Sequence, residues 1–141
     1  MISQKAQWGS LLVLAVTGWF WWGAAGPGFS QSEQVVEVAI KDHKFVTRQD
    51  VLRLGFATVI KVRNEDGVRH DFGSTMFEGL PAQIEKDGVI VYGRGLGGAY
   101  LDPKRDMVIR FNMTRPGRHE FRCSIHPNMA GELLLLSAEA V

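Results

Sequence analysis

The chain has 141 residues, of which 45% are hydrophobic and 22% charged, a composition typical of one folded globular domain and not of a disordered chain. Its 16 basic residues nearly balance its 15 acidic ones, so the net charge is +1 and the large positive excess that nucleic-acid binding requires is missing. A single cysteine, Cys123, excludes an internal disulfide and a cysteine-rich zinc site.

The N-terminal segment, residues 1–25, carries one charge, Lys5, ahead of the almost wholly apolar run 8–25, which predicts a hydrophobic helix. Two interpretations stay open. The run is a membrane anchor whose outer end is held by the aromatic residues 19–22, or it is a signal peptide cut after the small residues 23–25. In both cases we expect the remainder to be extracytoplasmic, in the periplasm or on the outer face of the cytoplasmic membrane.

Residues 26–34 contain Gly26, Pro27 and Gly28 and predict a linker, which residues 35–141 follow as one domain. Short alternating or β-branched segments separated by glycine and proline turns indicate β structure in this domain. The predicted strands are 35–40, 57–64, 89–92, 107–114, 118–123 and 132–137. We therefore predict an all-β fold, an antiparallel Greek-key β-sandwich preceded by the N-terminal helix.

The last two predicted strands are joined by a loop in which Cys123, His126 and Met129 follow one another at intervals of three residues. A thiolate, an imidazole and a thioether from one loop suit a soft metal, and His70 could supply a second imidazole. Two histidines, one cysteine and a weak axial methionine are the ligand set of a blue copper site. The sequence thus predicts one type 1 copper ion per chain, bound by these four residues.

The segment from Phe121 to Gly131 resembles the copper loop of the cupredoxins, the type 1 blue copper proteins, and its spacing is most like that of amicyanin, whereas plastocyanin places the methionine two residues later. Upstream, Asn64 and His70 resemble the strand-ending asparagine and the first copper histidine of that family. The resemblance implies that Asn64 hydrogen-bonds to Ser124 and so ties the two ligand loops together.

The stretch 74–103 is longer than expected in a minimal cupredoxin, and within it Met76 and Glu78 are alternative axial ligands. Of the two remaining histidines, His43 lies in a charged turn and His119 lies four residues before Cys123, so we expect neither to bind the metal.

The predicted function is that of a monomeric protein, not an enzyme, that carries single electrons between redox partners. The alternative is a copper-binding module for storage, delivery or sensing. An oxidase or a nitrite reductase would need several further histidines for a second copper site. We expect a redox protein partner, an acidic cytochrome or a copper enzyme, attracted by four arginines around the edge of His126. These are Arg69, Arg115, Arg118 and Arg122.

Overall fold

The computed structural model describes residues 33–137, so the predicted anchor or signal peptide and most of the predicted linker lie outside the described residues. Within residues 33–137, none of the helical structure is long and apolar enough to cross a membrane. The described elements are β1 (Gln34–Lys41), β2 (Lys44–Gln49), β3 (Leu52–Arg53), β4 (Ala57–Asn64), β5 (His70–Ser74), the 3-10 helix η1 (Thr75–Phe77), β6 (Pro81–Lys86), β7 (Val89–Arg94), β8 (Gly98–Leu101), β9 (Asp106–Asn112), β10 (Gly117–Arg122) and β11 (Ala130–Leu136).

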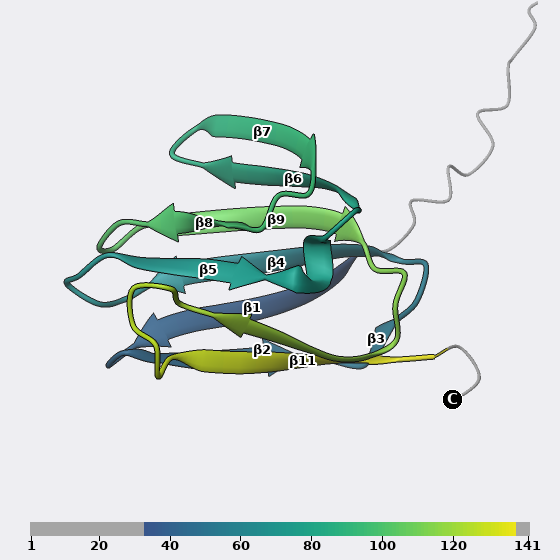
Figure 1. Ribbon diagram of the computed structural model, residues 1–141, viewed down its shortest axis with the longest axis horizontal. Helices are drawn as coiled ribbons and strands as arrows, with labels where there is room; N and C mark the ends of the chain where they lie inside the picture. Colours follow the sequence, from purple (N-terminus) through teal and green to yellow (C-terminus); the bar gives the residue numbers. More distant parts are fainter. Residues whose placement is uncertain (1–32, 138–141) are drawn as a thin grey trace, which may run out of the picture.

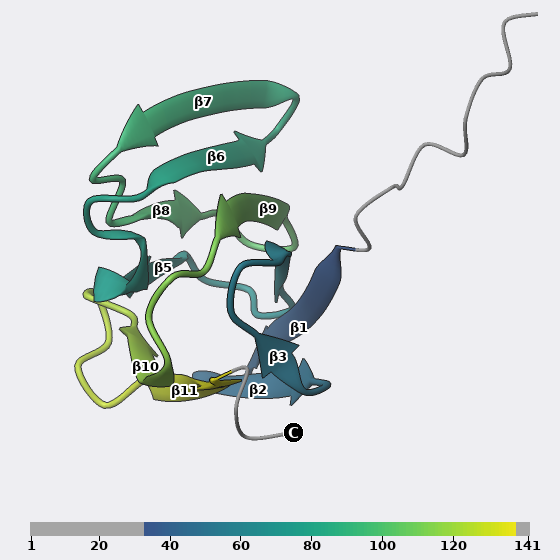
Figure 2. The same cartoon turned by 90° about the vertical axis from the view of Figure 1, so that its right-hand side faces the viewer.

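The strands form two sheets that pack face to face (Figures 1 and 2). The six-stranded sheet has the order β2-β1-β4-β9-β6-β7, and the five-stranded sheet has the order β3-β11-β10-β5-β8. Figure 2 shows β5 and β10 on one side of the molecule and β1 on the other, with the β6–β7 hairpin at one edge. The all-β prediction is confirmed.

The prediction of a purely antiparallel sandwich is wrong at two strand pairs. β1 runs parallel to β4, and β3 runs parallel to β11. The reason is that the chain does not return directly from β1 to β4. It passes through β2 and then β3, which pairs with the opposite sheet, and re-enters the first sheet in its original direction.

Alternation in the sequence explains how the long strands fill the core. In β4 the inward side chains Ile60 and Val62 are fully buried, while Lys61 and Arg63 point to solvent. β9 repeats the pattern, as predicted, because each second residue of a strand faces the same side. A cluster of phenylalanines completes the core: Phe72 and Phe121 from the five-stranded sheet and Phe77 from η1, with Phe45 and Phe111 packed edge-on against them.

The antiparallel pair of β5 and β10 determines where the candidate site lies. Arg122, the last residue of β10, pairs with Gly73 of β5, so the end of β10 and the beginning of β5 lie at the same edge of the sheet. His70 opens β5, and Cys123 directly follows β10. Figure 1 shows the β10–β11 loop, the β1–β2 turn and the start of β5 together at one end of the sandwich.

Candidate metal centre

Three side chains that the sequence predicts as metal ligands converge at this end of the sandwich. The ligand atoms of His70, Cys123 and His126 all lie within 4.8 Å of one another. The thiol sulfur Sγ of Cys123 lies 3.5 Å from Nδ1 of His126 and 3.9 Å from Nδ1 of His70. A metal–nitrogen bond of about 2.0 Å and a metal–sulfur bond of about 2.3 Å that meet at an angle of about 110–130° place the nitrogen and the sulfur at about these same separations. The three residues therefore fit one shared metal ion.

The four predicted ligands differ in how far they are buried. His70 is 0% exposed, Cys123 is 2% exposed and Met129 is 3% exposed, whereas His126 is half-buried. Because a buried thiolate and imidazole are shielded from water, they gain most from binding a cation together. The ring of His126 is the part of the candidate site that reaches toward solvent.

Backbone hydrogen bonds hold the loop that carries Cys123, His126 and Met129. The amide of Cys123 donates to the carbonyl of Met129 over 3.1 Å, and the amide of Met129 donates to the carbonyl of His126 over 2.9 Å. These bonds fold the loop back on itself. The backbone of Met129 is therefore hydrogen-bonded to both Cys123 and His126, and its side chain is buried.

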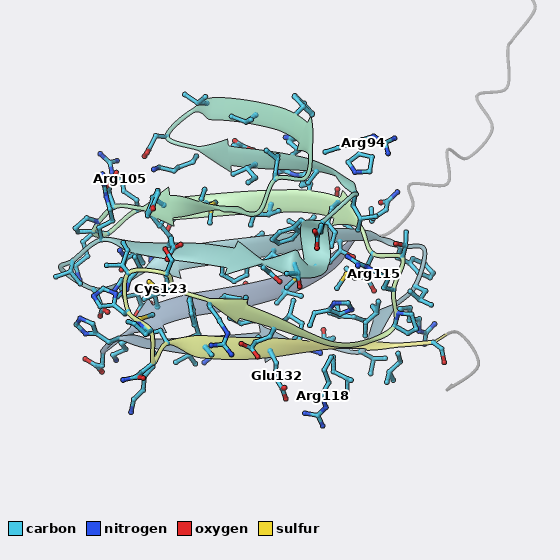
Figure 3. All side chains as sticks on the ribbon, viewed as in Figure 1. Arg94, Arg105, Arg115, Arg118, Cys123 and Glu132 are labelled. Atoms are coloured by element: carbon cyan, nitrogen blue, oxygen red, sulfur yellow. The ribbon has the colours of Figure 1, made fainter. Side chains whose placement is uncertain are left out.

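The alternative axial residues Met76 and Glu78 lie near the other end of β5. Five residue steps, at about 3.3 Å each, lead from His70 to Thr75, the first residue of η1. Arg115 donates to the carbonyl of Thr75 in η1 over 3.0 Å, and Figure 3 shows Arg115 and Cys123 at opposite ends of the sandwich. This placement leaves Met129 as the candidate axial ligand.

A carboxylate holds the buried His70 from behind. Nε2 of His70 lies 2.9 Å from Oδ2 of Asp66, which leaves Nδ1 directed toward Cys123. The carboxylate of Asp66 is itself fixed, because it accepts the backbone amides of Asp42 and His43 over 2.8 and 3.0 Å. An acidic partner on the outer nitrogen fixes the tautomer and the orientation of a metal-binding imidazole.

The surroundings favour the protonation states that metal binding needs. Burial lowers the pKa of His70 below its usual value, and the hydrogen bond to Asp66 opposes this effect without reversing it. Burial raises the pKa of Asp66, but the backbone hydrogen bonds from His43 and Asp42, together with the hydrogen bond and charge of His70, leave the pKa below its usual value. A neutral imidazole facing the thiol and a charged carboxylate behind it therefore coexist near neutral pH.

The predicted hydrogen bond from Asn64 to Ser124 is replaced by other contacts. The side-chain amide of Asn64 donates to the carbonyls of Val68, Leu101 and Asp102, because the fully buried Asn64 lies under the loop before β5. Asn64 therefore braces the loop that leads to His70 and does not reach Ser124.

Asp71, which sequence reasoning missed, ties the two ligand segments together. One carboxylate oxygen accepts the amide of Ser124 over 2.5 Å, and the other accepts the hydroxyl of Ser124 over 2.8 Å. The backbone amide of Asp71 also lies 3.4 Å from Sγ of Cys123 and points its hydrogen at the sulfur. Asp71, which directly follows His70, thus binds Ser124, which directly follows Cys123.

The two histidines expected to lie away from the metal have different positions. His119 lies apart from the site, with Nε2 2.8 Å from the carbonyl of Arg115. His43, in contrast, lies directly against it, with its ring centroid 5.3 Å from that of His70 and 4.9 Å from that of His126. The expectation that His43 does not bind the metal stays a prediction, but the sequence did not indicate that the tertiary fold packs the β1–β2 turn over the β10–β11 loop and so places His43 against the site.

The predicted positive face of arginines is also wrong. Arg118 pairs with Glu132 at 2.5 Å, as Figure 3 shows, and Arg122 pairs with Glu120. Arg69 pairs with Asp102 at 2.7 Å. These neighbouring carboxylates neutralise three of the four arginines, and the fourth, Arg115, lies at the opposite end of the sandwich from Cys123. Glu132 and Asp102 come from a neighbouring strand and a loop, which the alternation of a single strand does not reveal, whereas Glu120 lies two residues before Arg122 on β10.

The sequence carried different signals for the three residues it did not identify. Asp66 lies four residues before His70, and Asp71 lies directly after it, so their positions next to a predicted ligand were a usable signal. His43 carried none, because it lies 27 residues from His70 along the chain and only the packing of the sheets brings their rings together.

Several solved structures and one family model are similar to this chain. A search of curated protein sequences finds no match. A reduced amicyanin variant is 16% identical, with a TM-score of 0.47 over 73% of this chain and 83% of that chain. The Cu(I) form of another amicyanin variant is 17% identical, with a TM-score of 0.47 over 74% of this chain and 85% of that chain.

A multicopper oxidase from Campylobacter jejuni, described as a metallo-oxidase, is 14% identical with a TM-score of 0.52. The alignment covers 78% of this chain and 31% of the oxidase chain, so the likeness extends to one part of a larger protein and concerns the fold alone. The sequence model of the cupredoxin-like domain matches residues 11–135, which is most of the chain. The chain therefore belongs to the cupredoxin-like domain family.

Proposed function

We propose that this chain is an extracytoplasmic electron carrier that binds one copper ion through His70, Cys123, His126 and Met129. The observation that supports the proposal most directly is the approach of two imidazole Nδ1 atoms to one buried thiol sulfur, at 3.5 and 3.9 Å. When bound, copper supplies a one-electron couple between Cu(I) and Cu(II), with the soft sulfur donors favouring the reduced state.

The residues around the site are arranged to change little between the two oxidation states. The Asp66 carboxylate fixes the ring of His70, and the backbone bonds of the β10–β11 loop fix Cys123 and Met129. The amide of Asp71 and the body of the core keep water away from the thiol sulfur. Ligands held in this way favour repeated oxidation and reduction over release of the metal, which supports a carrier over a storage or delivery module.

The half-buried ring of His126 offers the route by which electrons reach the surface. Its neighbours in the loop, Ile125 and Pro127, are both exposed, and Ile125 is 43% exposed. A small apolar surface of this kind suits the brief docking of a redox partner, whose interface needs to be small to dissociate quickly.

Copper addition tests the proposal directly. The metal-free full chain is titrated with Cu(II) while absorption and electron paramagnetic resonance spectra are recorded. One equivalent is expected to produce an intense thiolate-to-copper band and a single resonance signal, and ascorbate is expected to bleach the band reversibly. Binding of copper without a thiolate band, or a reduction that cannot be reversed, would contradict the proposed carrier.

The side chain of Met129 is expected to set the potential and not to hold the ion. Met129→Leu preserves the apolar volume of this buried residue and removes the sulfur, so copper stays bound and the reduction potential rises. Cyclic voltammetry of the two loaded chains measures the difference, and Met113→Leu, at a buried methionine of the core, is the matched control. An unchanged potential would remove Met129 from the ligand set.

The carboxylate of Asp71 is expected to lower the potential. Asp71→Asn keeps an oxygen for the amide of Ser124 and a polar group for its hydroxyl, but it removes a negative charge next to the thiolate. Loss of that charge destabilises Cu(II) relative to Cu(I), so the potential rises while the visible band is retained. Glu120→Gln, an equal change of charge on the outer side of β10, is expected to shift the potential much less.

A further inference from the structure

The β1–β2 turn places an exposed imidazole in contact with both histidines of the candidate site. The ring of His43 meets the rings of His70 and His126 edge-on, at centroid distances of 5.3 and 4.9 Å, and the His43 side chain is nevertheless 56% exposed. A partner that touches His43 is therefore one ring away from either proposed ligand.

The backbone of this turn is left-handed at both of its central residues. Asp42 and His43 both have positive φ angles, 51° and 56°. A two-residue hairpin turn with this backbone most often carries Asn-Gly or Asp-Gly, so Asp42 is a usual residue at the first position and His43 stands where glycine is most common. The amides of both residues donate to Asp66, which fixes the turn against the residue that holds His70.

The residues that flank the turn carry a second unfavourable feature. Lys41 and Lys44 lie directly opposite each other in the β1–β2 register, and both are exposed. Like charges in directly opposed positions destabilise a strand pair. Among residues 33–137 neither lysine has an ion pair within 4 Å, in contrast to Arg118 and Arg122. Asp42 is the one acidic residue of the segment 41–44, so this segment carries a net positive charge.

An exposed histidine that contacts the site and stands where glycine is most common, together with two opposed lysines that destabilise the strand pair, indicates that the turn has a function other than folding. We propose that Lys41, His43 and Lys44 form the docking surface for a redox protein with a negatively charged face, and that His43 is the one of these three residues that lies nearest the candidate site. This inference rests on the proposed electron-carrier function and names the chemistry of the partner. The lysine ammonium groups attract carboxylates on the partner from a distance, and contact is completed over His43.

The surface can be mapped without electron transfer. Hexacyanochromate(III) is a redox-inert, paramagnetic trivalent anion that broadens the amide resonances of residues near which it binds. Added to the isotopically labelled full chain, it is expected to broaden the resonances of residues 41–44 first. Broadening centred on Arg118 and Arg122, or spread evenly over the chain, would overturn the proposal.

Matched charge variants test the role of the lysines. The double variant Lys41→Gln and Lys44→Gln is expected to weaken hexacyanochromate(III) binding about tenfold at low salt, because the steering field is removed. The double variant Arg118→Gln and Arg122→Gln makes the same change in net charge at ion-paired positions and is expected to have little effect. Equal effects of the two double variants would show that net charge alone attracts the anion.

His43→Asn tests the contact itself, since asparagine tolerates positive φ and so preserves the turn. In the reduced, copper-loaded variant, we expect hexacyanoferrate(III) to oxidise the copper more slowly than in the original chain. The visible band of the oxidised form and the reduction potential are expected to stay unchanged. An unaltered rate would exclude His43 as the contact. Failure of the chain to form a thiolate–copper band would instead contradict the proposed function, and the hexacyanochromate(III) map would still decide where the anionic partner docks.

Discussion

Replacing Cys123 with serine is expected to abolish the visible absorption of the copper-loaded chain completely. The chain contains one cysteine, so no second thiolate can take over the charge-transfer transition. Serine keeps the size of the buried side chain, but a hydroxyl is a hard and weakly acidic donor that suits copper poorly. Absorption spectra during Cu(II) titration measure the loss, and we expect at least a hundredfold weaker binding together with it.

Ser124→Ala provides the control for this experiment. It changes the neighbouring residue and removes one hydrogen bond to Asp71, while the thiol stays in place. The band is expected to persist in this variant. An intense band that survived in Cys123→Ser would show that the absorption arises elsewhere and would remove the thiolate from the proposed site.

Gly98→Ala is expected to destabilise the fold by about 3–5 kcal/mol, a large part of the stability of a domain of this size. Gly98 has a φ of 142°, a region that residues with a side chain rarely adopt. An added Cβ would overlap the carbonyl oxygen of Phe72 and lie 2.7 Å from Cα of Gly73, both on the neighbouring strand β5. Backbone cannot move aside as a flexible side chain can, so the strands must separate. Urea denaturation of the metal-free chain measures the change.

The adjacent Gly97 offers a matched control. An added Cβ at Gly97 meets no atom within 4 Å, so Gly97→Ala is expected to change the free energy of unfolding by less than about 0.5 kcal/mol. Equal stability of the two variants would mean that β8 does not approach β5 as closely as described. Because His70 and Asp71 lie on β5, Gly98→Ala is also expected to alter the copper spectrum, which Gly97→Ala should leave unchanged.

The strands that the sequence predicted well are those with regular alternation and one buried face. The segment 57–64 coincides with β4, and 107–114 and 118–123 agree with β9 and β10 to within two residues. Such strands are specified locally, because every second residue must be apolar for the sheet to pack. The N-terminal segment and its predicted membrane or secretory role stay predictions.

The missed strands carry little of this local signal. β2 has no fully buried residue, β3 has two residues, and β5 contains a histidine, an aspartate, a glycine and a serine. These segments become strands because a neighbour offers them hydrogen-bond partners, and that information lies in the tertiary fold and not in their own composition.

The candidate site shows the same division. Cys123, His126 and Met129 stand in one loop, so their spacing alone indicated a site. Asp71 and His43 act across strands, through contacts with Ser124 and with the two histidine rings, and a linear pattern does not contain such contacts. The sequence therefore indicated the residues with donor atoms. The groups that orient these residues, place charge beside them or pack over them became visible only in the fold.

The pairing of β5 with β10 has a consequence for the order in which the molecule forms. His70 and Cys123 are separated by 53 residues along the chain, and the strands that carry them share two register pairs, Phe121 with Ser74 and Arg122 with Gly73. Contacts between distant segments form late in folding, because the intervening chain must first be ordered. Neither half of the domain can assemble the thiolate with His70 alone. In a refolding experiment in the presence of copper, blue colour would therefore develop after the bulk of the β structure and would report the closure of the second sheet.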